Sequence, residues 1–390
     1  MSKTFPANKN LSRVTPNIIR EYDNQFSKID DIIKLTLGEP DFNVPEVSKQ
    51  AAIDSITGDD SHYGPSLGTQ ALREAIADFM QTRYDLTYHA DKNIVVTVGA
   101  TEAIYDTIAA FVNPGDKVLI PTPTFPLYES DTLILGAEPL LVNTQDDDFL
   151  LTPERLKATL DEFGDDIKVL ILNYPGNPTG RTYSDEQLKA LAEVLKDTDI
   201  VVIADEIYSE LTYDQNHHSI AQYLPEQTLI LNGVSKSHAM TGYRLGFIAG
   251  PEDLIQGPAL VHQMAVTTTP NPMAAAATVA LGTPAGHQAT MEMNDEYQDR
   301  RDYLVNALRD LGFELDTPEG AFYLFPRVPE AYGDDDPAFV TDLALKAKVG
   351  TVPGQAFGPG GEGHFRMSYA SSKATLEEAV SRIARFLEEQ

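Results

Sequence analysis

The chain has 390 residues, too many for one ordinary hydrophobic core, so its length predicts a large domain and a smaller one. Its formal net charge of -30, from 59 acidic and 29 basic residues, excludes nucleic acid and anionic membranes as expected partners, and an anionic ligand must find local positive charge. No cysteine is present, which excludes disulfides and cysteine-ligated metal sites, so we expect no metal and a soluble cytoplasmic protein.

Strands and helices alternate over most of the chain. After a short strand at 34–38, six apolar runs read as strands of one sheet: 94–98, 117–120, 139–142, 168–173, 200–204 and 228–232. Apolar residues at helical spacing predict helices at 47–56, 68–84, 129–135 and 185–195, and one that ends at Phe111. This alternation is typical of an α/β protein with a wide, mostly parallel sheet covered by helices on both faces.

The pattern changes near residues 282–286, where the alternation stops. A long charged helix is expected at 291–311, followed by strands at 313–315 and 322–325 and an amphipathic helix at 373–389. We therefore predict a large domain over 45–285 and a smaller α+β domain made of 1–44 and 286–390.

Polar motifs follow the predicted strands, at the edge where open α/β sheets bind ligands. The segment 99–102 opens a helix with small residues, which lets backbone N–H groups approach a phosphate, although a plain strand–helix turn has the same pattern. The rigid loop 174–180 either holds Asn177 as a hydrogen-bond donor or is an ordinary turn. Asp205 ends a buried strand, where it needs a cationic partner unless it caps a helix.

A lysine between small hydroxylated residues follows the strand at 228–232. Lys236 stands in the segment Gly-Val-Ser-Lys-Ser-His. A buried lysine at the end of a strand is unusual, and the ordinary alternative is a lysine on the surface. Arg244 follows eight residues later. The spacing allows Ser235, Lys236 and Arg244 to converge on one anion.

Six motifs stand in order between Gly38 and Ala370: YGPSLGTQALREAIADF, GATEA, NYPGNPTG, DEIYSELTYD, SKSHAMTGYRLGF and HFRMSYA. In this order they resemble the class I/II aminotransferases, pyridoxal-phosphate enzymes of fold type I. DEIYSELTYD with NGVSKSHAMTG is especially similar to the bacterial subgroup of N-acetyl-LL-diaminopimelate and aromatic aminotransferases. The resemblance implies transfer of an amino group from such a donor to a 2-oxo acid such as 2-oxoglutarate.

The resemblance also implies a role for each residue around the cofactor ring. Lys236 would form a Schiff base with the aldehyde of pyridoxal phosphate and then move the substrate proton, with its pKa brought down to about 7–8 by burial and neighbouring cations. Asp205 would pair with the pyridinium nitrogen. Tyr208 and Asn177 would donate to the phenolic oxygen, and Phe125 would stack on the ring.

The cofactor phosphate is the second group that the resemblance places. Ser235, Arg244 and the backbone at Ala100 and Thr101 would bind it, with Arg244 supplying the positive charge that so acidic a protein needs there. Tyr63 would reach the phosphate of a neighbouring subunit. The resemblance therefore implies a homodimer with shared active sites.

The substrate is expected at the same place. Arg366 would clamp its α-carboxylate, with Gly38 and Asn177 beside it. We expect no catalytic role for three histidines: His217, His218 and His238. Two alternatives stay open: a carbon–sulfur β-lyase that uses the same cofactor and residues, and a non-catalytic domain that binds the cofactor.

Overall fold

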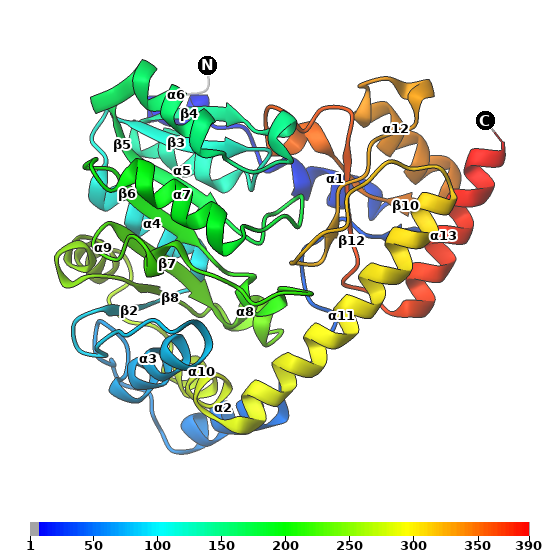
Figure 1. The fold of residues 1–390 in the computed structure, drawn as a ribbon. Helices are drawn as coiled ribbons and strands as arrows, with labels where there is room; N and C mark the ends of the chain where they lie inside the picture. The colour runs from blue at the N-terminus through cyan, green and yellow to red at the C-terminus, as the bar shows by residue number, and fades with distance from the viewer. Residues whose placement is uncertain (1–7, 390) are drawn as a thin grey trace, which may run out of the picture.

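A seven-stranded sheet forms the centre of the computed structural model, which describes residues 8–389 (Figure 1). The strands are β2 (Ile94–Thr97), β3 (Lys117–Thr122), β4 (Glu138–Asn143), β5 (Ile167–Asn173), β6 (Val201–Asp205), β7 (Thr228–Gly233) and β8 (Gly246–Ala249). Their spatial order is β2-β8-β7-β6-β5-β3-β4, and every neighbouring pair is parallel except the two that include β8. The predicted α/β class and mostly parallel sheet are confirmed.

All six strands predicted for this sheet are present, and β8 is the one that the sequence did not reveal. Its four residues lie in the run that follows Arg244, too short to stand out from the motif around them. Because β8 is antiparallel to β2 and β7, it places Arg244 beside the carboxyl end of β7.

Helices cover both faces of the sheet. One face packs against α4 (Ala100–Phe111), α5 (Leu127–Leu135) and α9 (Glu252–Ala265). The other packs against α3 (Gln70–Tyr84) and α10 (Asn271–Gly282) at one end, and against α6 (Pro153–Phe163) and α7 (Asp185–Leu195) at the other. Two more helices belong to the part of the chain that contains the sheet. Helix α2 (Glu46–Thr57) lies against α10, and α8 (Val234–Ser237) is a single turn. Helices α3 and α7 bury the apolar residues whose helical spacing predicted them.

A second region lies beside the sheet, on the right in Figure 1. Its helices are α1 (Ile18–Phe26), α11 (Pro284–Asp310), α12 (Asp336–Asp342) and α13 (Lys373–Glu388). Its short strands are β1 (Ile33–Lys34), β9 (Tyr323–Leu324), β10 (Val349–Gly350), β11 (Val352–Pro353) and β12 (Phe365–Ser368), which form the sheets β1-β10 and β11-β12-β9. Residues from both ends of the chain share one core there.

Three predictions for this region need correction. The strand expected at 34–38 is only two residues long and ends at Lys34, because the chain then turns into the cavity described below. No strand forms at 313–315, where Phe313 instead packs against the rings of Phe339 and Phe365. The long helix begins at Pro284, where Thr283 caps it, rather than at 291.

Helices α1, α6, α8, α9, α10 and α12 were not predicted. The apolar run in α10 is made largely of alanines, which show no periodicity because they are buried on several sides. No helix within residues 8–389 is long and apolar enough to cross a bilayer.

Candidate active site

A cavity of about 460 Å³ lies at the carboxyl ends of β5, β6 and β7. Helix α4 points its first residues into it, and α1 and β12 contribute from the second region. Eleven of the twelve predicted site residues line it: Gly38, Ala100, Thr101, Phe125, Asn177, Asp205, Tyr208, Ser235, Lys236, Arg244 and Arg366. Tyr63 is the exception, since its side chain is 88% exposed in a separate surface hollow that Asn271 also lines.

Asp205 ends β6 at the floor of the cavity and is almost fully buried. Its Oδ2 accepts a hydrogen bond from the Tyr128 hydroxyl at 2.7 Å, and its Oδ1 accepts one from the Ile207 N–H at 3.2 Å. Burial raises the pKa of Asp205 to about 6, although these two bonds oppose the shift. No cation pairs directly with this carboxylate among the described residues, so the floor of the cavity favours a cationic ligand atom.

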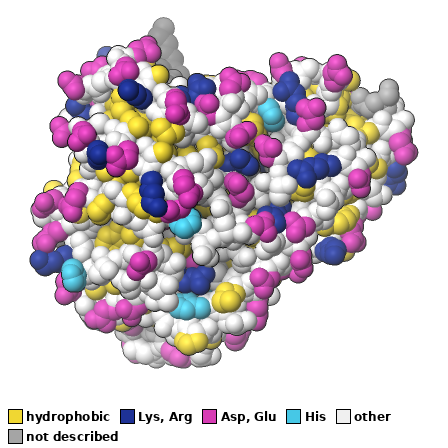
Figure 2. Space-filling view, viewed as in Figure 1, with side chains coloured by type: hydrophobic (Ala, Val, Ile, Leu, Met, Phe, Trp, Pro, Cys, Tyr) yellow, Lys and Arg dark blue, Asp and Glu magenta, His cyan; other side chains and the backbone are white. Residues whose placement is uncertain are grey.

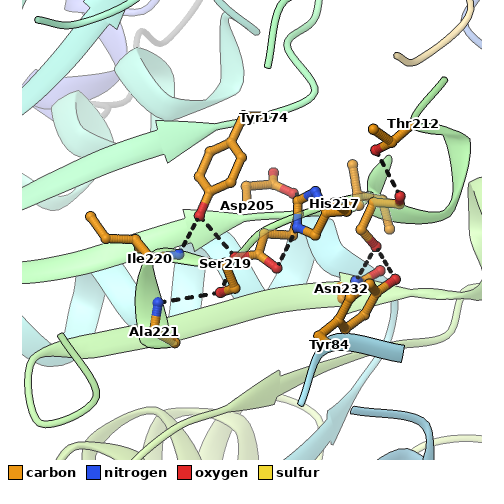
Figure 3. A network of polar contacts seen from close by, with 12 residues as sticks. Tyr84, Tyr174, Asp205, Thr212, His217, Ser219, Ile220, Ala221 and Asn232 are labelled. Atoms are coloured by element: carbon orange, nitrogen blue, oxygen red, sulfur yellow. Dashed lines mark hydrogen bonds and ion pairs between the residues drawn. The ribbon is translucent and has the colours of Figure 1, made fainter. Parts of the chain in front are cut away.

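Glu206, the next residue, does not line the cavity and contacts Tyr174, His217 and Ser219, which Figure 3 labels. Its carboxylate accepts hydrogen bonds from the Tyr174 hydroxyl at 3.0 Å and the Ser219 hydroxyl at 2.5 Å, and it contacts His217 Nε2 at 2.9 Å. The ring of His217 stacks on that of Tyr174. Neighbouring residues of an extended chain point to opposite sides, so the sequence Asp205-Glu206 puts one acid in the cavity and buries the other.

Lys236 follows β7 in the first turn of α8. Its Nζ donates a hydrogen bond to the Gly38 carbonyl at 2.6 Å, which joins the sheet edge to the segment after β1. The pKa of Lys236 is lowered to about 8, chiefly by burial; Glu39 opposes the shift, and Arg244 and Arg366 add to it. A pKa in this range leaves a larger fraction of neutral amine near neutral pH than an ordinary lysine has, which favours a role as proton-transfer base.

The start of α4 forms an anion cradle with Arg244. Gly99 precedes the helix with φ of +79° and no side chain caps it, so the first N–H groups face the cavity without a side-chain partner. A Cβ at Gly99 would lie 2.6 Å from Arg244 Nη2, so glycine is needed for the guanidinium to come this close. Arg244 holds its place through the Thr241 carbonyl and the Thr101 hydroxyl, at 3.0 and 3.4 Å. These groups fit a phosphate.

Arg366 reaches the cavity from β12 and is 1% exposed. Its Nη1 donates to Asn177 Oδ1 at 2.8 Å, its Nη2 donates to the Thr36 carbonyl, and its guanidinium stacks on the rings of Tyr323 and Phe357. Burial lowers the pKa of Arg366 from its ordinary value. Because the amide oxygen of Asn177 faces Arg366, its NH₂ group is left to donate to a ligand.

Two tyrosines complete the wall between the two regions. The hydroxyls of Tyr208 and Tyr323 lie 2.6 Å apart, and burial together with Tyr323 raises the pKa of Tyr208. A Cβ at Gly38 would lie 1.8 Å from the Tyr323 hydroxyl, so only glycine fits there. Phe125 is half-buried beside the cavity, with its ring 5.9 Å from that of Tyr128.

Several polar residues of the site were not identified from the sequence, among them Tyr128, Tyr323, Glu39 and Arg20. Tyr128 follows Phe125 by three residues, one helical turn, and this spacing could have indicated it. Tyr323 lies in an aromatic run that reads only as a strand, and Glu39 and Arg20 lie in segments that carry no separate signal.

Comparisons with known proteins agree with this geometry. The family model described as "Aminotransferase class I and II" matches residues 30–383. A probable N-acetyl-LL-diaminopimelate aminotransferase of Bacillus subtilis (strain 168) is 38% identical over 95% of this chain and 92% of its own. An aspartate aminotransferase of Pyrococcus abyssi is 37% identical over 97% of this chain and 98% of its own. The crystal structure of an aromatic aminotransferase from Pyrococcus horikoshii OT3 superposes with a TM-score of 0.87 at 36% identity, covering 94% of this chain and 99% of that one.

Proposed function

The chain belongs to the aminotransferase class I and II family, and from that premise we propose which of its residues carry out the reaction. It is a pyridoxal-5'-phosphate-dependent aminotransferase that acts on amino acids and 2-oxo acids. When bound, the cofactor carries the amino group between the two substrates and accepts the electrons released at the substrate α-carbon.

The observation that supports the residue roles is the meeting of four charged side chains around one cavity. Asp205, Lys236, Arg244 and Arg366 come from four separate segments, and all of them line it. A buried carboxylate without an ion pair fits the cationic ring nitrogen, and the cradle at α4 fits the phosphate. The fit therefore extends to both ends of the cofactor.

We assign the chemistry to Lys236, which would hold the cofactor and then move a proton at the substrate α-carbon through its neutral Nζ. Asp205 would keep the ring nitrogen protonated. The NH₂ group of Asn177 and the hydroxyl of Tyr208 would donate to the phenolic oxygen, and Phe125 would cover the ring.

The remaining roles concern the charged ends of cofactor and substrate. Arg244, Ser235 and the N–H groups of Ala100 and Thr101 would bind the phosphate. Arg366 would bind the α-carboxylate of the substrate, next to Gly38 and Asn177, and would fix the orientation of the C–H bond that breaks.

We propose a homodimer in which the face that carries Tyr63 meets a second copy. Tyr63 and Ile56 are 88% and 61% exposed in one surface hollow, which is costly for apolar rings and chains unless a partner covers them. Light scattering on the purified protein should give twice the 42.8 kDa chain mass. A monomer that binds the cofactor normally would contradict this proposal.

We also propose two domains, a large one over 45–285 and a small one from 1–44 and 286–390. The seven-stranded sheet lies wholly within the first range, and the small sheet β1-β10 combines strands from both ends of the chain. Limited proteolysis should cut first near the two junctions. Early cleavage within the wide sheet would contradict the division.

The proposed donors are N-acetyl-LL-diaminopimelate and aromatic amino acids, with 2-oxoglutarate as acceptor. Relatives named for N-acetyl-LL-diaminopimelate, aspartate and aromatic substrates resemble this chain about equally, so a donor screen is the direct test. The screen measures glutamate formed from 2-oxoglutarate with N-acetyl-LL-diaminopimelate, tyrosine, phenylalanine and aspartate. Pyruvate released from cystathionine without added 2-oxo acid would identify a β-lyase instead.

A further inference from the structure

Helices α4 and α9 enclose a cluster of three ionisable side chains. Glu102 and Asp106 stand one turn apart on α4, so both acids lie on the same face of that helix. His262 comes from α9, and one oxygen of each carboxylate and a ring nitrogen of the histidine all lie within 4.8 Å of one another. None of the three residues lines the cavity of the active site, so the proposed reaction leaves the cluster without a role.

Close packing of the two helices holds these side chains together. A Cβ at Gly257 of α9 would lie 2.9 Å from the Cβ of Ala110, one turn beyond the acids on α4, so the two backbones approach closely there. The side chain of His262 is fully buried, and its Nδ1 lies 2.8 Å from Glu102 Oε1. The other oxygen of Glu102 accepts a hydrogen bond from the Val98 N–H, just before α4. The cluster is therefore fixed from three segments of the chain.

Asp106 lacks the partners that a buried carboxylate needs. Its exposed fraction is 0%, and neither of its oxygens has a hydrogen-bond partner within residues 8–389. Acidic side chains are spread over the face shown in Figure 2, where water solvates them, but water does not reach this one. No lysine or arginine of the described chain forms an ion pair with Asp106 or Glu102, so two acids face a single imidazole.

We propose that Glu102, Asp106 and His262 bind a divalent transition-metal ion, with Zn²⁺ favoured. The two charges of the ion would balance the two carboxylates. An imidazole with two carboxylates is a ligand set that suits zinc, whereas Mg²⁺ and Ca²⁺ prefer oxygen ligands alone. Zinc binds such atoms at about 2.0–2.2 Å, which small side-chain rotations could achieve from the present separations.

The surroundings of the cluster are compatible with such an ion. The side chain of Glu102 is 11% exposed, which gives the ion a route inward and leaves a position for water as a fourth ligand. The absence of cysteine excludes sulfur ligands only, so this proposal replaces the expectation that no metal binds. Because Glu102 lies in the same helical turn as Ala100 and Thr101, the ion would also fasten the start of α4, where the phosphate cradle lies.

The alternative is a proton in place of the ion. Burial raises the pKa of Asp106 to about 7, Glu102 adds to the shift and His262 opposes it. A protonated Asp106 is neutral and needs no cation. Direct measurement of metal binding therefore separates the two possibilities, and it does not depend on the proposed function.

The test adds ZnCl₂ to holoenzyme that has been treated with a chelator and dialysed, with MgCl₂ in a parallel sample. Titration calorimetry and thermal unfolding are measured on the wild type, Asp106→Asn, His262→Gln and Asp131→Asn. Asp131 is the matched control, because it is a buried acid of the neighbouring helix α5 with one unpartnered oxygen, outside the cluster.

The wild type and Asp131→Asn should bind one Zn²⁺ per chain, and Zn²⁺ at a hundred times its Kd should raise their Tm by about 5 °C. Asp106→Asn and His262→Gln should weaken the binding on the order of 100-fold, and MgCl₂ should not reproduce the shift in Tm. Unchanged zinc binding in both cluster variants, no binding to the wild type, or an equal shift with MgCl₂ would overturn the proposal.

X-ray absorption at the zinc edge of the loaded wild type keeps the proposal testable if the cluster variants do not fold. One imidazole among oxygen ligands would support the site, since only one of the three proposed ligands is a histidine. A zinc environment without imidazole would overturn it.

Discussion

The sheet edge and helix α1 face the same cavity but are built in opposite ways. At the sheet edge, Asp205 and Lys236 are held by hydrogen bonds to Tyr128 and to the Gly38 carbonyl before any ligand binds. On α1, Arg20 is exposed and pairs with no carboxylate of the described residues. The comparison shows two ways of presenting charge to a cavity: buried groups fixed by contacts within the chain, and an exposed group on a helix.

Pre-organisation of this kind has a cost that the structure makes visible. Burial raises the pKa of Asp205 and lowers that of Lys236, so it disfavours the charged form that each group takes in water. An exposed arginine pays no such cost. Substitutions at the sheet edge should therefore affect all donors alike and change stability, while a substitution of Arg20 should leave stability unchanged.

The largest effect is expected for Lys236→Ala. Loss of the base should lower the single-turnover rate by about 10⁴-fold or more with glutamate and phenylalanine alike. Borohydride reduction followed by mass spectrometry should no longer attach the cofactor to the chain. A covalent label that survives the substitution would show that another residue holds the cofactor.

Asp205→Asn should come next. Removing one charge of a buried pair costs about 3–5 kcal/mol, which corresponds to roughly 10²- to 10³-fold or more in rate. The loss should again be the same for the two donor classes. A loss confined to glutamate would break the comparison, because it would place substrate selection at the sheet edge.

Glu206→Gln tests the network behind the edge. The substituted amide keeps the shape but cannot accept every hydrogen bond from Tyr174, Ser219 and His217, so unfolding should become easier by about 1–3 kcal/mol. Thermal or urea unfolding measures this, with Glu154→Gln on the exposed side of α6 as the control. Equal stability of the two variants would mean that the network does not stabilise the turn after β6.

The smallest effect concerns pH and the protein without cofactor. The pKa of Lys236 is about 8 when folded and near 10.4 when unfolded, so the unfolded chain binds more protons between these values and wild-type stability should rise with pH across that window. Lys236→Met should therefore stabilise the protein by about 1–2 kcal/mol at pH 7, and the gain should fade toward pH 10.5. Arg20→Met should change stability by less than about 0.5 kcal/mol at either pH. Urea unfolding of the two variants and the wild type at pH 7 and pH 10 measures these differences. If Lys236→Met is still as much more stable than the wild type at pH 10, the lowered pKa of Lys236 is not the cause of its gain.

Much of the sheet edge could be predicted from the sequence because its residues follow apolar strands directly. Buried strands are short, continuous and bounded by turn residues, so Asp205 and Lys236 could be placed at strand ends by pattern alone. The same reasoning did not predict β8, because its four residues directly follow the motif that contains Arg244 and are too few to be recognised as a separate strand.

The contacts that fix these residues were not predictable in the same way. Tyr323 meets Tyr208 from a strand 115 residues later in the chain, and nothing in local periodicity carries that information. Arg20 is an exposed arginine in a helix that carries no recognisable motif. Only the structure shows that it lines the cavity and that no described carboxylate pairs with it. Tyr63 remains a prediction, since its proposed contact is with a second chain.

The Lys236–Gly38 hydrogen bond and the position of Arg366 on β12 have a consequence for biosynthesis. A ribosome that has released the chain as far as β8 has already supplied Asp205, Lys236 and Arg244, whereas β12, which carries Arg366, is still to be translated. The order of synthesis therefore delivers the sheet edge before the strand that closes the cavity, so all the charged groups of the cavity are present only when translation is nearly finished.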